Sequence, residues 1–383
     1  MSSAAQSPSG VSETKLSSEL AARIAARGPI PFAEFMEACL YTPAHGYYSR
    51  PESARFADYY TSVDVHPIFG RLLARQLEEM WRLMDRPEPF WIVEPGAGVG
   101  RLAAQILDFA AAKLADFYSR LRYVAIERSP ARREAHPQAI GVHIEAGRAQ
   151  SAASLPEQIP QGCILSNEFF DAMPVHRVES RDGALQEVHV GFASGRFVDM
   201  PGPLSTHRIA DYFSRQGIVL NDGQQAEASL AACDWIAEAG RRLERGFLLT
   251  VDYGYEARVL YSESFPRGTL LAYRNHRVSE DFYAAPGEQD LTAHVNFTAL
   301  DLWGGNAGLE RAGLAPQSRF LLALGRGNDF ADLFDAGQSE TDRLRAQMQL
   351  SSLLHPEGMG ETFQVFIQRK GIGEPRLMGL APL

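Results

Sequence analysis

Residues 92–101, with the sequence IVEPGAGVGR, combine a short apolar run, an acid and three glycines at alternate positions: Gly96, Gly98 and Gly100. Glycines placed so closely after a strand let a ligand approach the backbone, as in phosphate and dinucleotide sites. The phosphate-loop string GxxxxGK[ST] is absent from the sequence, and dinucleotide folds favour GxGxxG over the GxGxG spacing present here. The alternative without any ligand is a tight turn between a strand and a helix.

An acid precedes these glycines and decides between the remaining ligands. Glu94 ends the apolar run, where its carboxylate would repel a pyrophosphate but attract the ammonium and sulfonium groups of S-adenosylmethionine. A second acid, Glu127 in YVAIERSP, ends the next predicted strand and is expected to bind the two ribose hydroxyls. Its alternative role is a charge at the N-terminus of the following helix. S-adenosylmethionine is therefore the predicted cofactor.

The string LSNEFFDAMPVH, residues 165–176, follows a third predicted strand and is expected to lie where the methyl group is transferred. It contains the candidates Asn167, Glu168 and Asp171, and the [DNS]PP[YFW] string of enzymes that methylate nucleic-acid bases is absent. Glu168 and Asp171 are three residues apart and would share one face of a helical turn. Such a carboxylate pair suits a guanidinium, which it can hold and polarise. The alternative is that both acids serve only the first turn of a helix.

A later segment, residues 268–297, is dense in polar and ionisable side chains: Tyr273, Arg274, Asn275, His276, Asp290, His294 and Asn296. His276 is the candidate catalytic residue of this segment, and a solvated loop is the alternative. A metal site is not expected, because these histidines lack carboxylate partners at ligand spacing.

Alternating strands and helices must position these residues. The apolar runs 90–94, 121–127 and 163–167 are predicted strands separated by helical patterns, and GFLLTVDYG and ETFQVFIQRK are predicted strands nearer the C-terminus. This alternation is typical of an α/β fold with a doubly wound, mostly parallel sheet. Residues 175–192 are instead predicted to form an antiparallel hairpin, followed by an irregular segment to residue 225.

The predicted organisation is a disordered tail (1–15), a helical region (16–85) and one large domain (86–383) with an insertion at about 175–225. A chain of 383 residues with 45% hydrophobic content can bury a large core. The formal net charge of −10 disfavours a nucleic-acid binder, and the three well-separated cysteines predict reduced, buried thiols. No apolar run approaches the ~20 residues of a membrane span. A soluble, cytoplasmic protein is therefore expected.

Six strings, in this order, resemble the mitochondrial dysfunction protein A family of S-adenosylmethionine-dependent methyltransferases: DYYTSVDVHPIFG, VEPGAGVGR, LSNEFFDAMPVHR, LLTVDYGY, GTLLAYRNHR and PGEQDLTAHVNF. The resemblance runs from about residue 17 to residue 370. It implies a seven-stranded, Rossmann-like class I methyltransferase domain with an N-terminal helical part and a substrate-side insertion. It also implies methylation of an arginine on a protein partner, because the family includes an arginine methyltransferase that assists assembly of mitochondrial complex I.

By the matching motifs, the resemblance implies that Gly96, Gly98 and Gly100 form the cofactor loop and that Glu127 contacts the ribose. It places Asn167, Glu168 and Asp171 at the methyl-transfer end. It also implies that a loop with Tyr60, Thr61 and Ser62 covers the cofactor. Three positions depart from the family pattern: Ala57 replaces a glycine, Val63-Asp64 replaces a Pro-Glu pair, and Asn296 replaces an aspartate. The first two would alter the cofactor loop, and the third argues against an acid role at residue 296.

The predicted function is methylation of an arginine of a protein partner, with Glu168, assisted by Asp171, orienting the guanidinium. A small-molecule methyltransferase with the same cofactor site is the first alternative, and an assembly or scaffold protein that binds S-adenosylmethionine is the second. A dehydrogenase ranks last. A homodimer is compatible with the sequence, which does not define the substrate protein.

Overall fold

The computed structural model describes residues 14–49, 62–275, 277–334, 338–355 and 362–382. The chain forms two compact units, each built from separate stretches of sequence. The first unit comprises residues 1–59, 172–232 and 257–294, and the second comprises 60–171, 233–256 and 295–383. The units therefore do not divide at residue 85, where the predicted helical region ends. The predicted tail lies outside the described residues up to residue 13, and Lys15 already begins a helix.

The main sheet of the second unit has eight strands: β2 (Phe90–Pro95), β3 (Leu121–Ile126), β4 (Ala149–Ala152), β5 (Ile159–Asn167), β10 (Leu243–Tyr255), β14 (Val295–Asn296), β15 (Glu310–Pro316) and β16 (Phe363–Lys370). Seven of them run in the order β15-β16-β10-β5-β2-β3-β4, and β14 pairs with β10. All run parallel except β16, which is antiparallel to both neighbours. The predicted mostly parallel α/β sheet is confirmed.

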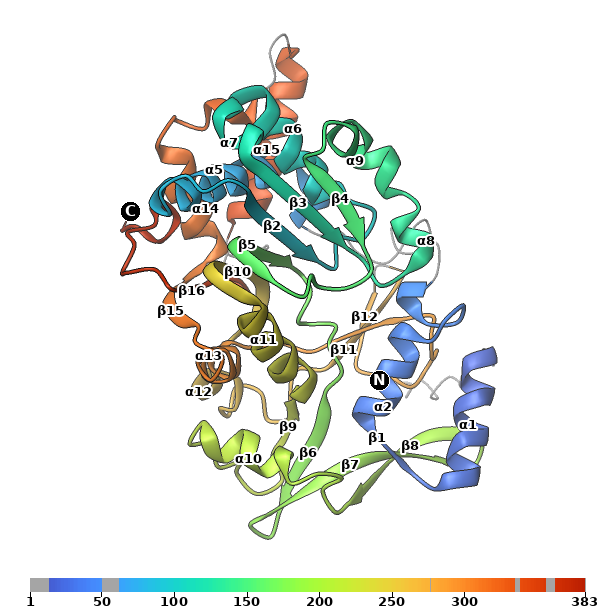
Figure 1. Cartoon of the computed structure of the whole chain (residues 1–383). Helices are drawn as coiled ribbons and strands as arrows, with labels where there is room; N and C mark the ends of the chain where they lie inside the picture. The colour runs from blue at the N-terminus through green and yellow to red at the C-terminus, as the bar shows by residue number, and fades with distance from the viewer. Residues whose placement is uncertain (1–13, 50–61, 276, 335–337, 356–361, 383) are drawn as a thin grey trace, which may run out of the picture. The chain divides into compact units, whose positions relative to one another are not determined.

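Helices lie around this sheet, and Figure 1 labels all of them except α4: α4 (Ser62–Val65), α5 (Ile68–Leu83), α6 (Arg101–Lys113), α7 (Ala115–Arg120), α8 (Pro130–Arg133), α9 (His136–Glu145), α11 (Leu230–Arg242), α13 (Phe297–Gly305), α14 (Gln317–Arg326) and α15 (Glu340–Leu354). Apolar residues of α5, α6 and α14 form one core with alternate strand residues such as Ile92 and Leu249. Successive side chains of a strand point to opposite faces of the sheet. Val365 and Ile367 therefore join this core, whereas Phe366 between them points to the opposite face and packs against Phe297 of α13. The alternation of apolar residues in the sequence thus becomes a sheet buried on both sides.

The first unit is built on antiparallel strands: β1 (Ile30–Pro31), β6 (His176–Arg181), β7 (Ala184–Ala193), β8 (Arg196–Gly202) and β9 (Gln225–Ala228) form one sheet, and β11 (Leu271–Arg274), β12 (Arg277–Ser279) and β13 (Asp290–Thr292) form another. Its helices are α1 (Lys15–Arg27), α2 (Phe32–Tyr41), η1 (Tyr47–Ser49), α10 (Arg208–Arg215) and α12 (Ala257–Leu260). The predicted hairpin is β6–β7.

Two expectations for this unit were wrong. The segment 193–225, predicted to be irregular, contains β8 and α10. Residues 268–297 include a three-stranded sheet in which β13 is fully buried, rather than only a solvated loop. β8 forms a hairpin with β7 through the turn at Ser194 and Gly195, and β13 pairs with β11 from an earlier part of the chain. Short strands of this kind have too little periodicity to be recognised locally.

An ion pair in the first unit joins the buried Arg177 to the exposed Asp199. The Arg177 guanidinium forms two hydrogen bonds with the Asp199 carboxylate, at 2.6 and 3.1 Å. It also lies over the rings of Phe32 and Phe282, 5.2 and 4.6 Å from their centroids. This arrangement compensates the buried charge with a carboxylate and two aromatic faces.

Cys39, Cys163 and Cys233 are buried and outside any disulfide, as predicted. Burial raises the pKa of the Cys39 and Cys163 thiols. Among the described residues, no helix has the length and hydropathy needed to cross a membrane.

Candidate active site

The three glycines form a turn at the carboxyl end of β2. Gly96, Gly98 and Gly100 have φ angles of 70°, 56° and 90°, in the left-handed region that glycine adopts most readily. Gly100 is the N-cap of α6, so the turn leads directly into the helix. The Ala97 N–H donates to the carbonyl oxygen of Ile126 at 2.8 Å, which ties the turn to the end of β3. Backbone with little side-chain bulk is thus presented where parallel α/β sheets bind nucleotide-like ligands.

Glu127 lies beside this turn, as the sequence indicated. Its carboxylate is 8% exposed and accepts hydrogen bonds from the Gly98 N–H at 3.1 Å and the Ser129 N–H at 2.8 Å. Each carboxylate oxygen has further acceptor capacity, so these bonds leave lone pairs for two hydroxyl donors. Contact with the ribose of the cofactor therefore remains our prediction for Glu127.

Glu94 is almost completely buried at the end of β2, with 4% exposure. The Tyr123 hydroxyl of the neighbouring strand donates to its Oε2 at 2.7 Å. The pKa of Glu94 is raised to about 7: burial is the main cause, the Tyr123 hydrogen bond opposes it, and the Glu127 carboxylate makes a smaller contribution to the rise. A carboxyl group in this environment gains most from a cationic ligand, because the ligand would replace the lost stabilisation by water.

This pKa predicts that cofactor binding depends on pH. Near pH 5.5 Glu94 is mostly protonated and neutral, and near pH 7 about half of it is ionised. Affinity for S-adenosylmethionine should therefore rise about tenfold between these pH values, because the cation favours the ionised form. Isothermal calorimetry of wild type and Glu94→Gln checks this, since the glutamine variant should bind weakly with a flat pH profile. Tyr123→Phe should move the midpoint to higher pH, and a wild-type affinity that is constant over this range would contradict the role of Glu94.

The segment after β5 carries the predicted methyl-transfer residues. Glu168 has a φ of 49°, and its N–H donates to the Val251 carbonyl oxygen of β10 at 2.9 Å. Its Oε1 accepts hydrogen bonds from the Ser62 N–H at 3.0 Å and from Asn167 Nδ2 at 3.2 Å. The Oδ1 of Asn167 is buried and has no hydrogen-bond partner among the described residues. An amide oxygen in this state is suited to accept an N–H from a ligand.

β10 determines the shape of this segment through two side chains at its carboxyl end. Oδ2 of the fully buried Asp252 accepts hydrogen bonds from the Phe169 N–H at 3.0 Å and the Phe170 N–H at 2.9 Å. The Tyr253 hydroxyl donates to Oδ2 of Asp171 at 2.7 Å. Burial raises the pKa of Asp252 well above its ordinary value, and the nearby Asp171 carboxylate adds to the effect.

The predicted helical turn that would place Glu168 and Asp171 on one face is therefore wrong. Residues 168–173 form bends and turns without a helix. The left-handed Glu168 interrupts a right-handed helix, and Asp252 takes the N–H groups of the next two residues. Glu168 is half-buried, whereas Asp171 is buried against Tyr253. The two acids thus have different surroundings.

Phe169 links this segment to the glycine turn. A Cβ atom added at Gly96 would stand 2.9 Å from Cδ2 of the Phe169 ring. The same ring makes an edge contact with Trp235 of α11, with centroids 4.8 Å apart. The cofactor turn and the methyl-transfer segment therefore touch directly within the second unit.

The other predicted site residues fall in different places. Ser62 is fully buried and bonds to Glu168, and its hydroxyl contacts Oε1 of Gln317 at 3.3 Å. Tyr60, Thr61, His276 and the divergent Ala57 lie outside the described residues. At Val63 the backbone carbonyl accepts from Nε2 of Gln105 at 2.9 Å. Asn296 is the N-cap of α13, where its side chain accepts from the Ala299 N–H at 3.1 Å, a structural role that needs no acid.

Three residues of this site were missing from the sequence-based set: Tyr123, Asp252 and Tyr253. Tyr123 bonds to Glu94, which is 29 residues away in sequence, and Asp252 bonds to residues that are at least 82 positions away. The one available signal was an apolar strand ending in an acid, in GFLLTVDYG. Such a signal places Asp252 at the correct sheet edge but does not reveal what it contacts.

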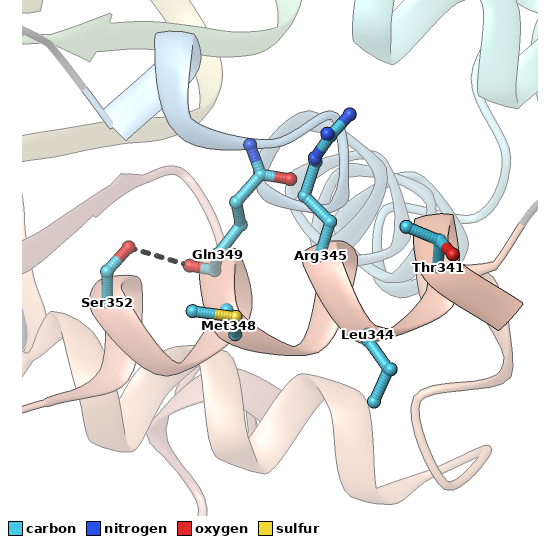
Figure 2. A pocket seen from close by; sticks show the side chains of 6 residues that line it. All are labelled: Thr341, Leu344, Arg345, Met348, Gln349 and Ser352. Carbon is cyan, nitrogen blue, oxygen red and sulfur yellow. Dashed lines mark hydrogen bonds between the residues drawn. The ribbon is translucent and has the colours of Figure 1, made fainter.

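A surface pocket lies elsewhere, on the outer face of α15 (Figure 2). Its lining residues all belong to this helix: Thr341, Leu344, Arg345, Met348, Gln349 and Ser352. The most exposed apolar side chains there are Met348 and Leu344, with 74% and 57% exposure. It shares no residue with the glycine turn or the methyl-transfer segment, and one helix face cannot enclose a nucleoside.

The strand order, the glycine turn and the two flanking acids together define a class I methyltransferase. A model of a family described as S-adenosyl-L-methionine-dependent methyltransferases matches residues 72–315, and the chain belongs to this family. S-adenosylmethionine is its cofactor. The glycine turn, with Glu94 and Glu127 beside it, is our predicted site for this cofactor.

Known relatives agree with this assignment. The chain is 31% identical over 310 residues to the mitochondrial protein arginine methyltransferase NDUFAF7 homolog of Drosophila melanogaster, covering 74% of this chain and 68% of the relative. It is 26% identical over 372 residues to protein arginine methyltransferase NDUFAF7 of Homo sapiens, covering 90% and 81%. A Burkholderia thailandensis protein crystallised with S-adenosyl-homocysteine has a TM-score of 0.84 and 30% identity, covering 96% of this chain and 94% of that one.

These relatives correct one expectation. The proteins from the fly and from vertebrates are named as mitochondrial, so the predicted cytoplasmic location is wrong as an inference for this family. The expectation followed from the lack of an apolar run long enough to span a membrane, and such a lack does not distinguish one aqueous compartment from another.

Proposed function

We propose that this methyltransferase modifies an arginine side chain of a protein partner. The observation that carries the proposal is the Asn167–Glu168 pair after β5. It offers a half-buried carboxylate held by Ser62, next to an amide oxygen that has no hydrogen-bond partner among the described residues. A guanidinium carries several N–H donors and one positive charge, and it can satisfy both groups at once. The names of the relatives, protein arginine methyltransferases, support the same choice.

The chemistry required of these residues is modest. S-adenosylmethionine, when bound, supplies the methyl group: its carbon–sulfur bond breaks with the electron pair staying on sulfur, and a guanidinium nitrogen forms the new carbon–nitrogen bond. Glu168 would orient the guanidinium and accept the proton that this nitrogen loses, so that the methylated arginine keeps a single positive charge. Asn167 Oδ1 would hold a second N–H. Most of the rate would come from positioning.

Asp171 has a different part in this proposal from the one predicted. Oδ2 of its carboxylate accepts from the Tyr253 hydroxyl, and Asp171 is buried whereas Glu168 is half-buried, so Asp171 would support the segment rather than contact the guanidinium. Glu168 is then the single acid that contacts the acceptor. This differs from a bidentate clamp of two carboxylates, which needs both side chains to face the same ligand.

The purified protein, incubated with labelled S-adenosylmethionine and a protein extract, should transfer label to arginine. Mass spectrometry of the labelled proteins should identify methylated arginine residues. If the label enters only small molecules, the enzyme is a methyltransferase of another substrate class and the arginine proposal is overturned. If no label is transferred although calorimetry shows that the cofactor binds, a scaffold function replaces the enzymatic one.

A further inference from the structure

His136 is buried directly behind the glycine turn. It is the first residue of α9 and is 0% exposed. Its Nε2 lies 2.9 Å from the carbonyl oxygen of Gly98, and its Nδ1 lies 2.7 Å from Oγ of Ser151 in β4. The ring also packs against the turn, because a Cβ atom at Gly100 would be 3.5 Å from its Cδ2. One side chain thus joins the turn, α9 and β4.

These contacts determine the tautomer of the ring. A carbonyl oxygen only accepts hydrogen bonds, so Nε2 carries the proton that is donated to Gly98. Nδ1 of the neutral ring then accepts from the Ser151 hydroxyl, which can donate. Burial lowers the pKa of His136, and the ring is therefore neutral near pH 7. The charged groups nearest to it are Glu127, which favours the protonated form, and Arg133, which opposes it.

Both polar groups of Gly98 are consequently engaged by side chains from the same part of the chain. The Gly98 N–H donates to Glu127 and its carbonyl oxygen accepts from His136, and only nine positions separate these two residues in sequence. Arg133 lies between them and donates to the carbonyl oxygen of Glu127. The peptide groups on both sides of Gly98, which has a φ of 56°, therefore cannot rotate without breaking one of these bonds.

We propose that His136 is a positioning residue for the cofactor: its Nε2–H bond to Gly98 holds the glycine turn in the conformation that binds S-adenosylmethionine. Glu127 is bonded to the same glycine, so the turn and the acid predicted to bind the ribose form one unit before the cofactor arrives. A turn that is already ordered loses less conformational entropy on binding, which increases affinity. His136 itself does not touch the cofactor.

Two substitutions separate this role from simple packing. In His136→Gln, the side-chain amide can reach the position of Nε2 and still donate to Gly98. In His136→Asn, the amide reaches only the position of Nδ1, so it can bond to Ser151 but not to Gly98. Both variants replace the ring with an uncharged amide, and both leave Glu94, Glu127 and the glycines unchanged.

Calorimetry with S-adenosyl-homocysteine and thermal unfolding of the apoprotein test the proposal. Binding should be about tenfold weaker in His136→Asn, because a buried carbonyl loses its donor, while His136→Gln should stay within about threefold of wild type. If His136→Asn does not fold, His136→Phe provides the same comparison, since it fills the space without a donor. The proposal is overturned if His136→Gln binds S-adenosyl-homocysteine no better than the variant that cannot donate to Gly98, which is His136→Asn or His136→Phe. This holds whether both variants bind like wild type or both bind more weakly and unfold at a lower temperature.

Discussion

Replacing Glu168 with glutamine should lower the rate of methyl transfer to protein arginine by about 10² to 10³-fold at saturating S-adenosylmethionine, the size of effect typical for removing one electrostatic contact to a transition state. Glutamine has the same shape and can still accept from the Ser62 N–H and Asn167 Nδ2, so the turn should be kept. It loses the negative charge that orients a guanidinium and accepts its proton.

Cofactor affinity is the internal control for this variant. Glu168 lies on the acceptor side, whereas the glycine turn, Glu94 and Glu127 are unchanged, so calorimetry with S-adenosyl-homocysteine should give a wild-type dissociation constant. A Glu168→Gln protein that methylates arginine at the wild-type rate would remove Glu168 from the mechanism. A variant that is inactive because it no longer binds the cofactor would assign Glu168 to the cofactor site instead.

Asp252 should act through Glu168, because its carboxylate accepts the N–H groups of Phe169 and Phe170, the two residues that follow Glu168. Asp252→Asn places an amide donor where the carboxylate accepts, and methyl transfer should fall by about 10-fold or more. In the Glu168→Gln background the same substitution should cost little, since residues that act as one unit are not additive. Thr250→Val is the matched control, because Thr250 is also buried on β10 and its hydroxyl contacts Ser166. Additive losses would contradict this dependence.

Gly96→Ala should have the second large effect, on cofactor binding and on stability. The new methyl group would stand 2.9 Å from Cδ2 of Phe169, on a residue with a φ of 70°. Either the turn or the Phe169 ring must move, and the free energy of unfolding should fall by about 2–5 kcal/mol from strain and overpacking together. The dissociation constant for S-adenosyl-homocysteine should rise by about tenfold or more, since a loss of about 1.4 kcal/mol of binding free energy from the displaced turn is sufficient.

Gly147→Ala separates these two causes. Gly147 has the same φ of 70°, but a Cβ atom there has no heavy atom within 4 Å. This variant should lose only about 1–2 kcal/mol from backbone strain, with unchanged cofactor affinity. Urea unfolding and calorimetry of both proteins make the comparison, and equal behaviour of the two alanine variants would show that the contact with Phe169 has no consequence.

The sequence predicted the parts of the site that depend on single elements. The glycine turn follows an apolar strand, and the structure shows it with three positive φ angles and α6 directly behind it. Glu127 was expected at the end of the next strand, where it would contact the ribose, and the structure shows its carboxylate bonded to Gly98 of the turn. The ribose contact itself stays a prediction. The mostly parallel sheet followed from the same alternation of strands and helices.

Most of the errors concern contacts over long sequence distances. The turn at Glu168 and Asp171 was predicted as helical because local spacing allowed it, but Asp252 and Val251 of a strand more than 80 residues away bind its backbone. β13 is a strand because β11 pairs with it. β8 is a different case, since it pairs with β7 through the turn at Ser194 and Gly195, a local signal that was overlooked. His136 was not selected, since a lone histidine near a helix start gives no sign of the carbonyl that it meets.

The sequence by itself therefore determined the fold class, the cofactor and the family, because strand periodicity, closely spaced glycines and acids at strand ends are local properties. Only the tertiary structure decided which polar side chains of the site are buried, which are bonded to the backbone and which remain accessible to a ligand. Burial raises the pKa of Glu94 to about 7 although the hydrogen bond from Tyr123 opposes the rise. His136 and Glu127 both bond to Gly98, and the contacts of β10 leave Glu168 half-buried and Asp171 buried. Each of these assignments depends on which side chains meet after folding, and burial then sets their charge and hydrogen bonding.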